Sequence, residues 1–530
     1  MKRWNGWGDE ATTYPLPDSA ARYLANLVGE GPHLLDASLE ETLQAVPPAS
    51  LPAHPLISTD PEARLRHARG QSLPDWIALR SGQLRAFPDG VAYPASRQEV
   101  RSLLDYAKKT GIKLIPYGGG TSVVGHINPL PGNAPVLSMD LSRLKRLLAL
   151  DESSHLATFE AGVSGPEIEK QLNARGYTLG HFPQSFVLST LGGWIVTRSS
   201  GQQSYHYGRI EALFAGGHLE TPSGTMDLPV HPASAAGPDL KQIVLGSEGR
   251  LGVLTQATLR VRPLPEFEAF YGVFFRNWEQ GANAVRQIAQ AGVGVSMLRM
   301  SNAIETTTTL ALSGQDDLVK WAGRGLGALG YGNERALLVF GVTGTRRQAS
   351  QARREALEII RAQGGLMTGT AIGKMWKKSR FYAPYLRNTL WEAGYALDTL
   401  ETAIPWSEVA ATAEETQKVI RAGLADAGER VLVFAHLSHV YRDGASIYIT
   451  YLFRRTDPDE TLRRWQALKG AASRVILAHG GTISHQHGVG LDHAAYLPAE
   501  KGPLGMQTLE SVIRLFDPDG TMNPGKLLAI

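Results

Sequence analysis

Short apolar runs alternate with amphipathic segments through residues 86–265. Each run is bounded by turn-forming residues, which favours strands at 91–94, 113–116, 136–139, 155–160 and 254–261. A helix is expected after Ser96, because Glu99 stands at the spacing of a capping box, and a second helix is expected at 166–175. The pattern predicts a mixed α+β domain over this part of the chain.

A second alternation, with longer elements, covers residues 266–465. Helical periodicity is present at 279–291 and 347–363, and strands are expected at 272–275, 336–343, 430–441 and 446–453. Arg442-Asp443-Gly444 joins the last two strands and is a hairpin turn signal. Strand–helix–strand alternation with antiparallel pairing predicts a ferredoxin-like substrate (cap) domain.

The two ends of the chain complete the expected organisation. Residues 1–85 predict an N-terminal helical extension, with helical spacing at 35–43 and a helix entry at Asp60-Pro61. A long helix is expected at 459–479, and residues 466–530 form a C-terminal segment that returns to the first domain. The chain has 530 residues, too many for one ordinary core, which agrees with a division into several domains.

Composition removes several classes of function. The chain has no cysteine, which excludes disulfides, iron–sulfur clusters and cysteine-ligated zinc. Its net charge of +3 gives no argument for nucleic acid binding. No apolar run approaches the roughly 18 residues of a membrane span, and the N-terminus carries no secretion signal. These observations predict a cytoplasmic protein without a transmembrane segment.

A run of three glycines follows the strand expected at 113–116. Pro116-Tyr117-Gly118-Gly119-Gly120-Thr121-Ser122 removes the β-carbons from one side of a loop and adds two hydroxyl donors. Successive N–H groups in such a loop can hold an anion, which suits the diphosphate of a dinucleotide. A glycine triplet can also be a plain turn. The chain contains neither the Rossmann nor the Walker A glycine pattern.

Blocks farther along the chain favour the dinucleotide interpretation. They are Gly180–Ser185, Ser189–Trp194, Thr197–Gly201, Tyr207-Gly208 and Gly246–Val253. In this order, the blocks resemble the flavin-binding domain of the vanillyl-alcohol-oxidase/PCMH-type FAD enzymes. The closer resemblance is to the alkyldihydroxyacetonephosphate synthase family, and it extends from Lys2 to Lys526.

The resemblance implies a PCMH-type FAD-binding domain and assigns its cofactor-binding residues. They are Pro116, Tyr117, Gly118, Gly119, Gly120, Thr121, Ser122, Pro183, Gln184, Ser185, Thr190, Gly192, Gly193, Thr197, Ser200, Gly201, Tyr207, Gly208, Glu248, Gly249, Gly252, Val253 and Asn523. Members with a histidyl–flavin bond carry that histidine in the glycine loop, where this chain has Gly120 and Thr121, so non-covalent FAD is expected.

His485 and His487 are candidates for acid–base chemistry. If 483–487 is extended, both imidazoles point to one face, where they could bind a metal, transfer protons or act as structural donors. No third metal ligand stands at a clear spacing, so no metal is expected. The resemblance places both histidines beside the flavin. The family has three consecutive histidines, whereas this chain has Gln486 in the middle, and glutamine cannot carry a proton at neutral pH.

Tyr448 and Arg387 complete the candidate catalytic set. Alternation in Ser446–Tyr451 puts Ser446, Tyr448 and Thr450 on a polar face, although tyrosine is also common in strands because it packs well. By the resemblance, Tyr448 is the catalytic base, and it would need a pKa lowered by neighbours such as His487 or Arg387. The resemblance also assigns Arg387 to a substrate phosphate. A guanidinium could equally hold a carboxylate.

Two enzymatic functions follow from these candidates. The first is exchange of the acyl group of acyl-dihydroxyacetone phosphate for a fatty alcohol, a step of ether-lipid synthesis with no net redox change. The second is an FAD-dependent dehydrogenase or oxidase of a 2-hydroxy acid such as D-lactate or glycolate. A non-enzymatic FAD-binding partner is disfavoured, because Tyr448, His485, His487 and Arg387 occur together. A lipid substrate allows peripheral membrane contact, and dimers are common among such enzymes.

Overall fold

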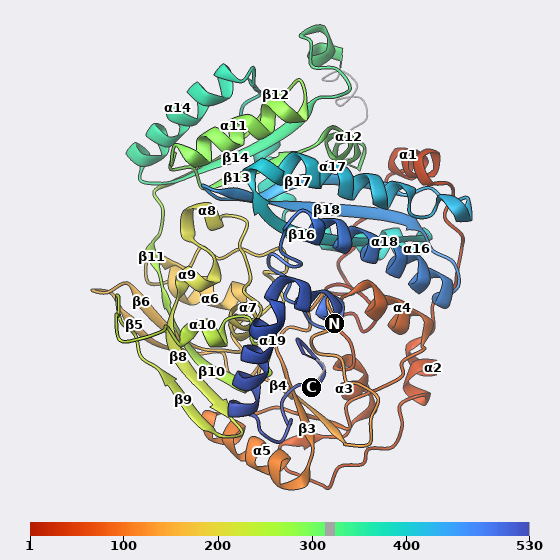
Figure 1. The fold of residues 1–530 in the computed structure, drawn as a ribbon, viewed down its shortest axis with the longest axis vertical. Helices are drawn as coiled ribbons and strands as arrows, with labels where there is room; N and C mark the ends of the chain where they lie inside the picture. The colour runs from red at the N-terminus through yellow and green to blue at the C-terminus, as the bar shows by residue number, and fades with distance from the viewer. Residues whose placement is uncertain (313–323, 529–530) are drawn as a thin grey trace.

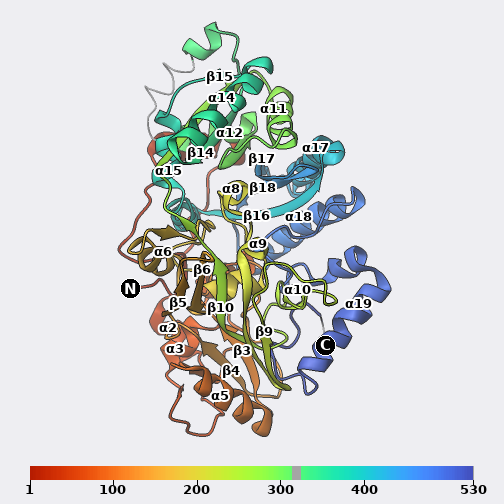
Figure 2. The same cartoon turned by 90° about the vertical axis from the view of Figure 1, so that its left-hand side faces the viewer.

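The computed structural model describes residues 1–312 and 324–528, which form two bodies stacked along the long axis (Figures 1 and 2). The lower body holds the sheets of the first half of the chain. The upper body holds one large sheet from the second half. Both chain ends lie in the lower half of the molecule in the two views.

Two main sheets build the lower body. A four-stranded sheet has the order β1-β2-β4-β3, from Ile57–Ser58, Gly90–Ala92, Val136–Asp140 and Lys113–Tyr117; β2, β4 and β3 are parallel. A five-stranded antiparallel sheet has the order β5-β6-β10-β8-β9, from Leu147–Asp151, Leu156–Glu160, Val253–Arg260, Phe214–Thr221 and Gly224–Leu228. The predicted strands are therefore present, whereas β1, β5, β8 and β9 were not predicted.

Helices of the lower body begin where the sequence places their caps. The Ser96 side chain accepts from the Glu99 N–H at the start of α5 (Arg97–Thr110), which buries Leu103 and Leu104. The other helices are α6 (Gly165–Asn173), α7 (Leu191–Val196), α8 (Ser204–Tyr207), α9 (Ile210–Leu213) and α10 (Lys241–Val244). A small pair, β7 (Tyr177–Thr178) with β11 (Arg262–Pro263), closes this body.

A seven-stranded antiparallel sheet forms the centre of the upper body. Its order is β15-β12-β14-β13-β17-β18-β16, from Leu366–Met367, Phe267–Phe275, Ala336–Gly344, Met297–Ser301, Leu432–Val440, Gly444–Arg454 and Tyr395–Pro405. Helices of this body are α11 (Trp278–Gln290), α12 (Ala303–Leu312), α14 (Arg346–Ala362), α15 (Ala371–Ser379), α16 (Leu386–Glu392), α17 (Trp406–Ala422) and α18 (Pro458–Ala478). Three of the seven strands, β13, β15 and β16, were not predicted.

The predicted alternation in β18 is confirmed. Ile447, Ile449 and Tyr451 lie in the main hydrophobic core, whereas the side chains of Tyr448 and Thr450 line a cavity on the other face. The hairpin that joins β17 to β18 is also present. The strand pattern of the sequence therefore identified which face of the sheet carries the chemistry.

The N-terminal extension is helical, as predicted, and supports both bodies. Its helices are α1 (Asp18–Val28), α2 (Leu39–Gln44), α3 (Pro61–Arg66) and α4 (Leu73–Ser81). Asp60 caps α3, and Ser38 makes a capping box with Glu41 on α2. Leu24 and Val28 of α1 join the apolar cluster of β16, β17 and β18, and Trp76 of α4 is fully buried.

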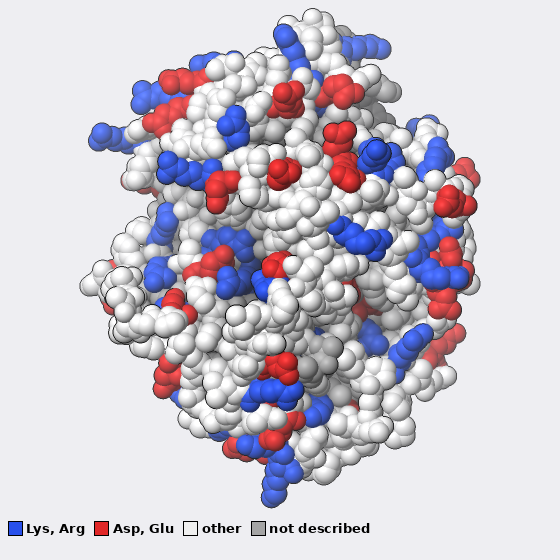
Figure 3. All heavy atoms as spheres, viewed as in Figure 1, with Lys and Arg blue, Asp and Glu red and all other residues white. Residues whose placement is uncertain are grey.

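The C-terminal segment returns to the lower body. Helix α19 (Leu497–Phe516) is followed by a bridge between Met522 and Leu114 of β3. The two-body α+β architecture is confirmed, while the predicted domain limits (1–85, 86–265, 266–465 and 466–530) stay predictions. Within the described residues, no helix combines the length and apolar character needed to cross a bilayer. Positive and negative side chains are interspersed on the face shown in Figure 3.

Candidate active site between the two bodies

A cavity of about 1170 Å³ lies between the two bodies. The lower body contributes the glycine loop, residues between Pro183 and Gln202, the Glu248-Gly249 pair and Asn523. The upper body contributes side chains of the large sheet, α15 and α16, including Tyr448 and Arg387. The cavity therefore brings together most of the residues that the sequence selected from distant parts of the chain.

The glycine loop after β3 has no room for side chains. A β-carbon on Gly118 would lie 2.2 Å from Thr190 Oγ1, and one on Gly119 would lie 1.9 Å from the Leu188 carbonyl oxygen. Gly120 has φ of 70°, which favours glycine. The loop packs against residues 188–190 on one side and lines the cavity on the other. This cradle fits a bound diphosphate.

The predicted cofactor-binding residues divide into two groups. The first group lines the cavity: Pro116, Gly118, Gly119, Gly120, Thr121, Ser122, Pro183, Gln184, Ser185, Thr190, Gly193, Thr197, Ser200, Glu248, Gly249 and Asn523. The second group lies behind the wall: Tyr117, Gly192, Gly201, Tyr207, Gly208, Gly252 and Val253. Members of the second group allow close packing, as at Gly192, whose β-carbon would lie 3.1 Å from Ala161 Cβ.

Glu248 joins the glycine-loop side of the cavity to the C-terminal segment. Its carboxylate accepts hydrogen bonds from the backbone N–H groups of Val489 and Gly490 and lies 3.2 Å from His126 Nε2. Asn523 Nδ2 donates to the carbonyls of His126 and Glu248 at 3.0 and 2.8 Å. Because the backbone N–H groups of Val489 and Gly490 already bind its carboxylate, Glu248 contributes to the cavity wall by holding the C-terminal segment in place.

Tyr448 lies between two imidazoles. Its ring stacks on His436 with centroids 4.9 Å apart and meets the edge of His487 at 6.2 Å. Its hydroxyl donates to Thr399 Oγ1 at 3.1 Å. Burial raises the pKa of the phenol, and the hydrogen bond to Thr399 and the charge of Arg387 only partly oppose this. The expected lowering of this pKa is therefore wrong, because burial outweighs the nearby cation.

Arg387 presents a cation to the cavity. Its guanidinium lies over the ring of Trp76, 4.4 Å from the centroid, and Nη1 donates to the carbonyl of Gln71. Nε and Nη2 are buried and have no hydrogen-bond partner among the described residues. Burial lowers the pKa of Arg387, yet the group stays charged. An anionic ligand would satisfy these two donors.

The segment 483–487 bends, so the extended conformation that would point both imidazoles to one face is not present. Gln486 and His487 line the cavity, whereas His485 lies behind them. Arg209 Nη1 and the Tyr441 hydroxyl lie 2.5 and 2.6 Å from His485 Nε2. A guanidinium can only donate, so Nε2 accepts and the neutral imidazole carries its proton on Nδ1. That nitrogen faces Glu401 Oε1 at 3.1 Å.

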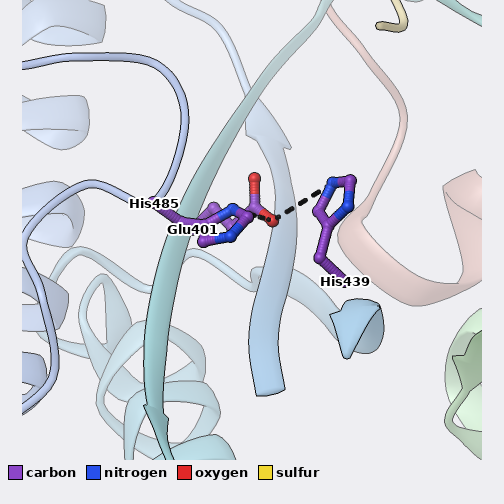
Figure 4. A group of neighbouring side chains, drawn as sticks. All are labelled: Glu401, His439 and His485. Carbon is purple, nitrogen blue, oxygen red and sulfur yellow. Dashed lines mark ion pairs between the residues drawn. The ribbon is translucent and has the colours of Figure 1, made fainter. Parts of the chain in front are cut away.

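Glu401, His439 and His485 form a buried group that could be mistaken for a metal centre (Figure 4). His439 Nε2 lies 4.0 Å from Glu401 Oε1. The carboxylate already accepts from Ser438 and Ser446, both at 2.7 Å, and His485 Nδ1 carries a proton. The Glu401 oxygen that faces both histidines is therefore already occupied by hydroxyl donors, and the proton on His485 Nδ1 would have to leave before that nitrogen could bind a cation. Sequence reasoning missed Glu401, since its strand β16 was not predicted.

Two family models match the chain: the FAD binding domain over residues 88–227 and the C-terminal domain of FAD linked oxidases over residues 264–527. The chain is 30% identical to the alkyldihydroxyacetonephosphate synthase of Dictyostelium discoideum, covering 99% of this chain and 93% of that protein. The chain belongs to the alkyldihydroxyacetonephosphate synthase family. It is an FAD-dependent enzyme, which confirms the prediction from the sequence that the chain is a flavoprotein.

Another synthase sequence, a solved synthase structure and a more distant dehydrogenase are also similar to this chain. The synthase of Trypanosoma brucei brucei is 29% identical, over 99% of this chain and 92% of that protein. A solved alkyldihydroxyacetonephosphate synthase structure superposes with a TM-score of 0.83 at 27% identity, covering 99% of this chain and 98% of the other. The mitochondrial D-lactate dehydrogenase (cytochrome) of Arabidopsis thaliana is 25% identical, over 83% of this chain and 73% of that protein.

Replacing Gly119 by Ala should remove most of the bound flavin. The added β-carbon would meet the Leu188 carbonyl at 1.9 Å, and this clash with backbone should shift the loop out of the diphosphate position. The flavin-to-protein ratio, measured by absorbance after purification, is expected to fall to well under half. Gly132→Ala is the matched control, because nothing lies within 4 Å of its β-carbon. Full flavin content in Gly119→Ala would contradict the assigned cradle.

Proposed function

We propose that the enzyme exchanges the acyl group of an acyl-dihydroxyacetone phosphate for a fatty alcohol, the ether-forming step of ether-lipid synthesis. One observation carries this proposal: the cavity combines an anion-binding arginine with an apolar wall. Arg387 and a set of apolar side chains both line the cavity. These apolar residues are Met297, Leu312, Leu337, Ile372, Met375 and Trp376.

The apolar wall favours a long-chain substrate over a small hydroxy acid. Burying a chain contributes about 0.8 kcal/mol for each methylene group, so a wall of this kind binds an alkyl group strongly. D-Lactate and glycolate have no such chain and would leave this surface unused. Arg387 is expected to hold the phosphate through the parallel donors of its guanidinium.

When held by the glycine loop and the residues around it, FAD would supply an electron-accepting ring for an exchange that has no net redox change. Tyr448 is proposed as the group that removes a proton from the substrate carbon. Because burial favours the neutral phenol, Tyr448 must transfer its own proton to another group before it can remove a proton from the substrate. His487, whose ring centroid lies 6.2 Å from that of Tyr448, is proposed as the acceptor; burial lowers the pKa of His487, which keeps that imidazole neutral.

His485 is proposed to position the loop rather than to contact substrate. Arg209 Nη2 donates to the His485 carbonyl at 2.9 Å, and the His485 N–H donates to the Glu401 carbonyl at 3.2 Å. These contacts fix the backbone immediately before Gln486 and His487. The predicted catalytic set therefore becomes Tyr448, His487 and Arg387 at the cavity, with His485 in support.

Incubation of the purified protein with palmitoyl-dihydroxyacetone phosphate and hexadecanol tests the proposal. Ether product is expected, with no bleaching of the flavin by D-lactate or glycolate under anaerobic conditions. Tyr448→Phe should keep its flavin but lose about a hundredfold or more of the rate, as removal of a general base typically does. Tyr177→Phe, away from the cavity, is the control. Bleaching by a hydroxy acid without ether product would favour the dehydrogenase alternative.

We further propose peripheral membrane contact through α15 and the residues after it. Lys374, Lys377 and Lys378 are exposed, and Met375 and Tyr382 are 43% and 53% exposed. Met375, Lys378 and Tyr382 also line the cavity, so the same surface would open toward the bilayer that holds the substrate. Basic and apolar residues together favour an anionic lipid surface. The cytoplasmic location and a homodimer stay predictions.

Met375→Asp should weaken binding to phosphatidylglycerol vesicles roughly tenfold, because it places a negative charge at the proposed contact. Sedimentation with the vesicles measures the bound fraction. Leu515→Asp introduces the same charge on α19 at a side chain that is 71% exposed, and it should bind like the unmodified protein. Equal weakening by both variants would show that the contact does not lie at α15.

A further inference from the structure

Gln486 is the residue of the 485–487 bend whose part in the chemistry is still unassigned. It lines the cavity next to His487, while its other neighbour, His485, is turned away from the cavity. Its side chain makes one hydrogen bond among the described residues, in which Nε2 donates to Glu401 Oε2 at 2.5 Å. Glu401 therefore holds the side-chain amide of Gln486, and the residue lines the cavity that is proposed to bind substrate.

The charge of Glu401 decides which end of the amide faces the cavity. Burial alone would raise the pKa of this carboxyl, but the facing Nδ1–H of His485, with smaller effects of His439 and His487, holds it well below its usual value. An ionised carboxylate can only accept hydrogen bonds. The Gln486 Nε2 group must therefore face Glu401, and the carbonyl oxygen Oε1 must be directed elsewhere.

Glu401 cannot easily turn to release this constraint. Its side chain is fully buried, and Oε1 accepts from the hydroxyls of Ser438 and Ser446 while facing His485 Nδ1. The Glu401 carboxylate is therefore surrounded by polar groups of Ser438, Ser446, His485 and Gln486. The amide of Gln486 is oriented before any ligand binds, and a preorganised group loses little entropy when it forms a hydrogen bond.

We infer that Gln486 Oε1 accepts a hydrogen bond from the hydroxyl of the incoming alcohol, with Glu401 as the residue that positions it. This inference rests on the proposed function. Gln486 cannot take the proton, so its contribution is to bind and orient the O–H group beside Tyr448 and His487. Unlike a histidine at this position, the amide does not titrate near neutral pH.

Gln486→Met tests the inference, because methionine has similar length and lacks the carbonyl acceptor. We expect the KM for hexadecanol to rise about tenfold, the cost of one lost hydrogen bond, with the KM for palmitoyl-dihydroxyacetone phosphate changed less than twofold. The dissociation constant of 1-dodecanol, measured by calorimetry without turnover, should rise equally. Glu401→Gln, which no longer fixes the amide direction, should weaken alcohol binding in the same way.

Gln351→Met is the matched control, because Gln351 donates to Glu355 at 2.9 Å on the exposed face of α14. It should change neither constant. Equal rises in the two KM values, or unchanged alcohol binding in Gln486→Met, would overturn the inference while leaving ether formation intact. Absence of ether product from the unmodified enzyme, together with unchanged dodecanol affinity in Gln486→Met, would reject both the function and this role.

Discussion

The buried guanidinium of Arg387 is the interaction on which the rest of the site depends. A buried cation is costly unless it is paired, and two of its nitrogens have no partner among the described residues. The protein supports it with the face of Trp76 and the carbonyl of Gln71, both at or near α4 of the N-terminal extension. The extension therefore contributes to the wall of the cavity, and we propose the anion of the substrate as the partner of Arg387.

Two buried carboxylates support the strand that carries Tyr448. On one side Glu401 holds Gln486 and faces His485. On the other side Glu305 pairs with His436, the residue stacked on Tyr448, at 3.0 Å. Each carboxylate has cationic or hydrogen-bonding neighbours that hold its pKa below the usual value despite burial. Tyr448 is fixed between these two networks, which suits the proton-removing role that we propose for it.

The sequence predicted the parts of the fold that depend on local chemistry. Helix starts at Ser96 and Asp60, the glycine loop and the two faces of β18 follow from capping, β-carbon removal and alternation. Strand β16 escaped prediction because Asp398, Glu401 and two threonines interrupt its apolar pattern. Asp398 and Glu401 are buried because partners from other strands and helices satisfy them, and such partners cannot be read from neighbouring positions. The bend at 485–487 and the raised pKa of Tyr448 also depend on contacts between distant parts of the chain, so the local sequence pattern did not predict them.

The role of Arg387 can be tested most directly by measuring substrate affinity in Arg387→Ala. The account predicts that the dissociation constant of the phosphate-bearing substrate rises about thirtyfold or more, since a charged hydrogen-bonded pair contributes about 2 kcal/mol, while flavin content and dodecanol affinity stay unchanged. Arg354→Ala, at an exposed arginine of α14, should bind all three ligands normally. Unchanged affinity for the phosphate-bearing substrate in Arg387→Ala would contradict the account.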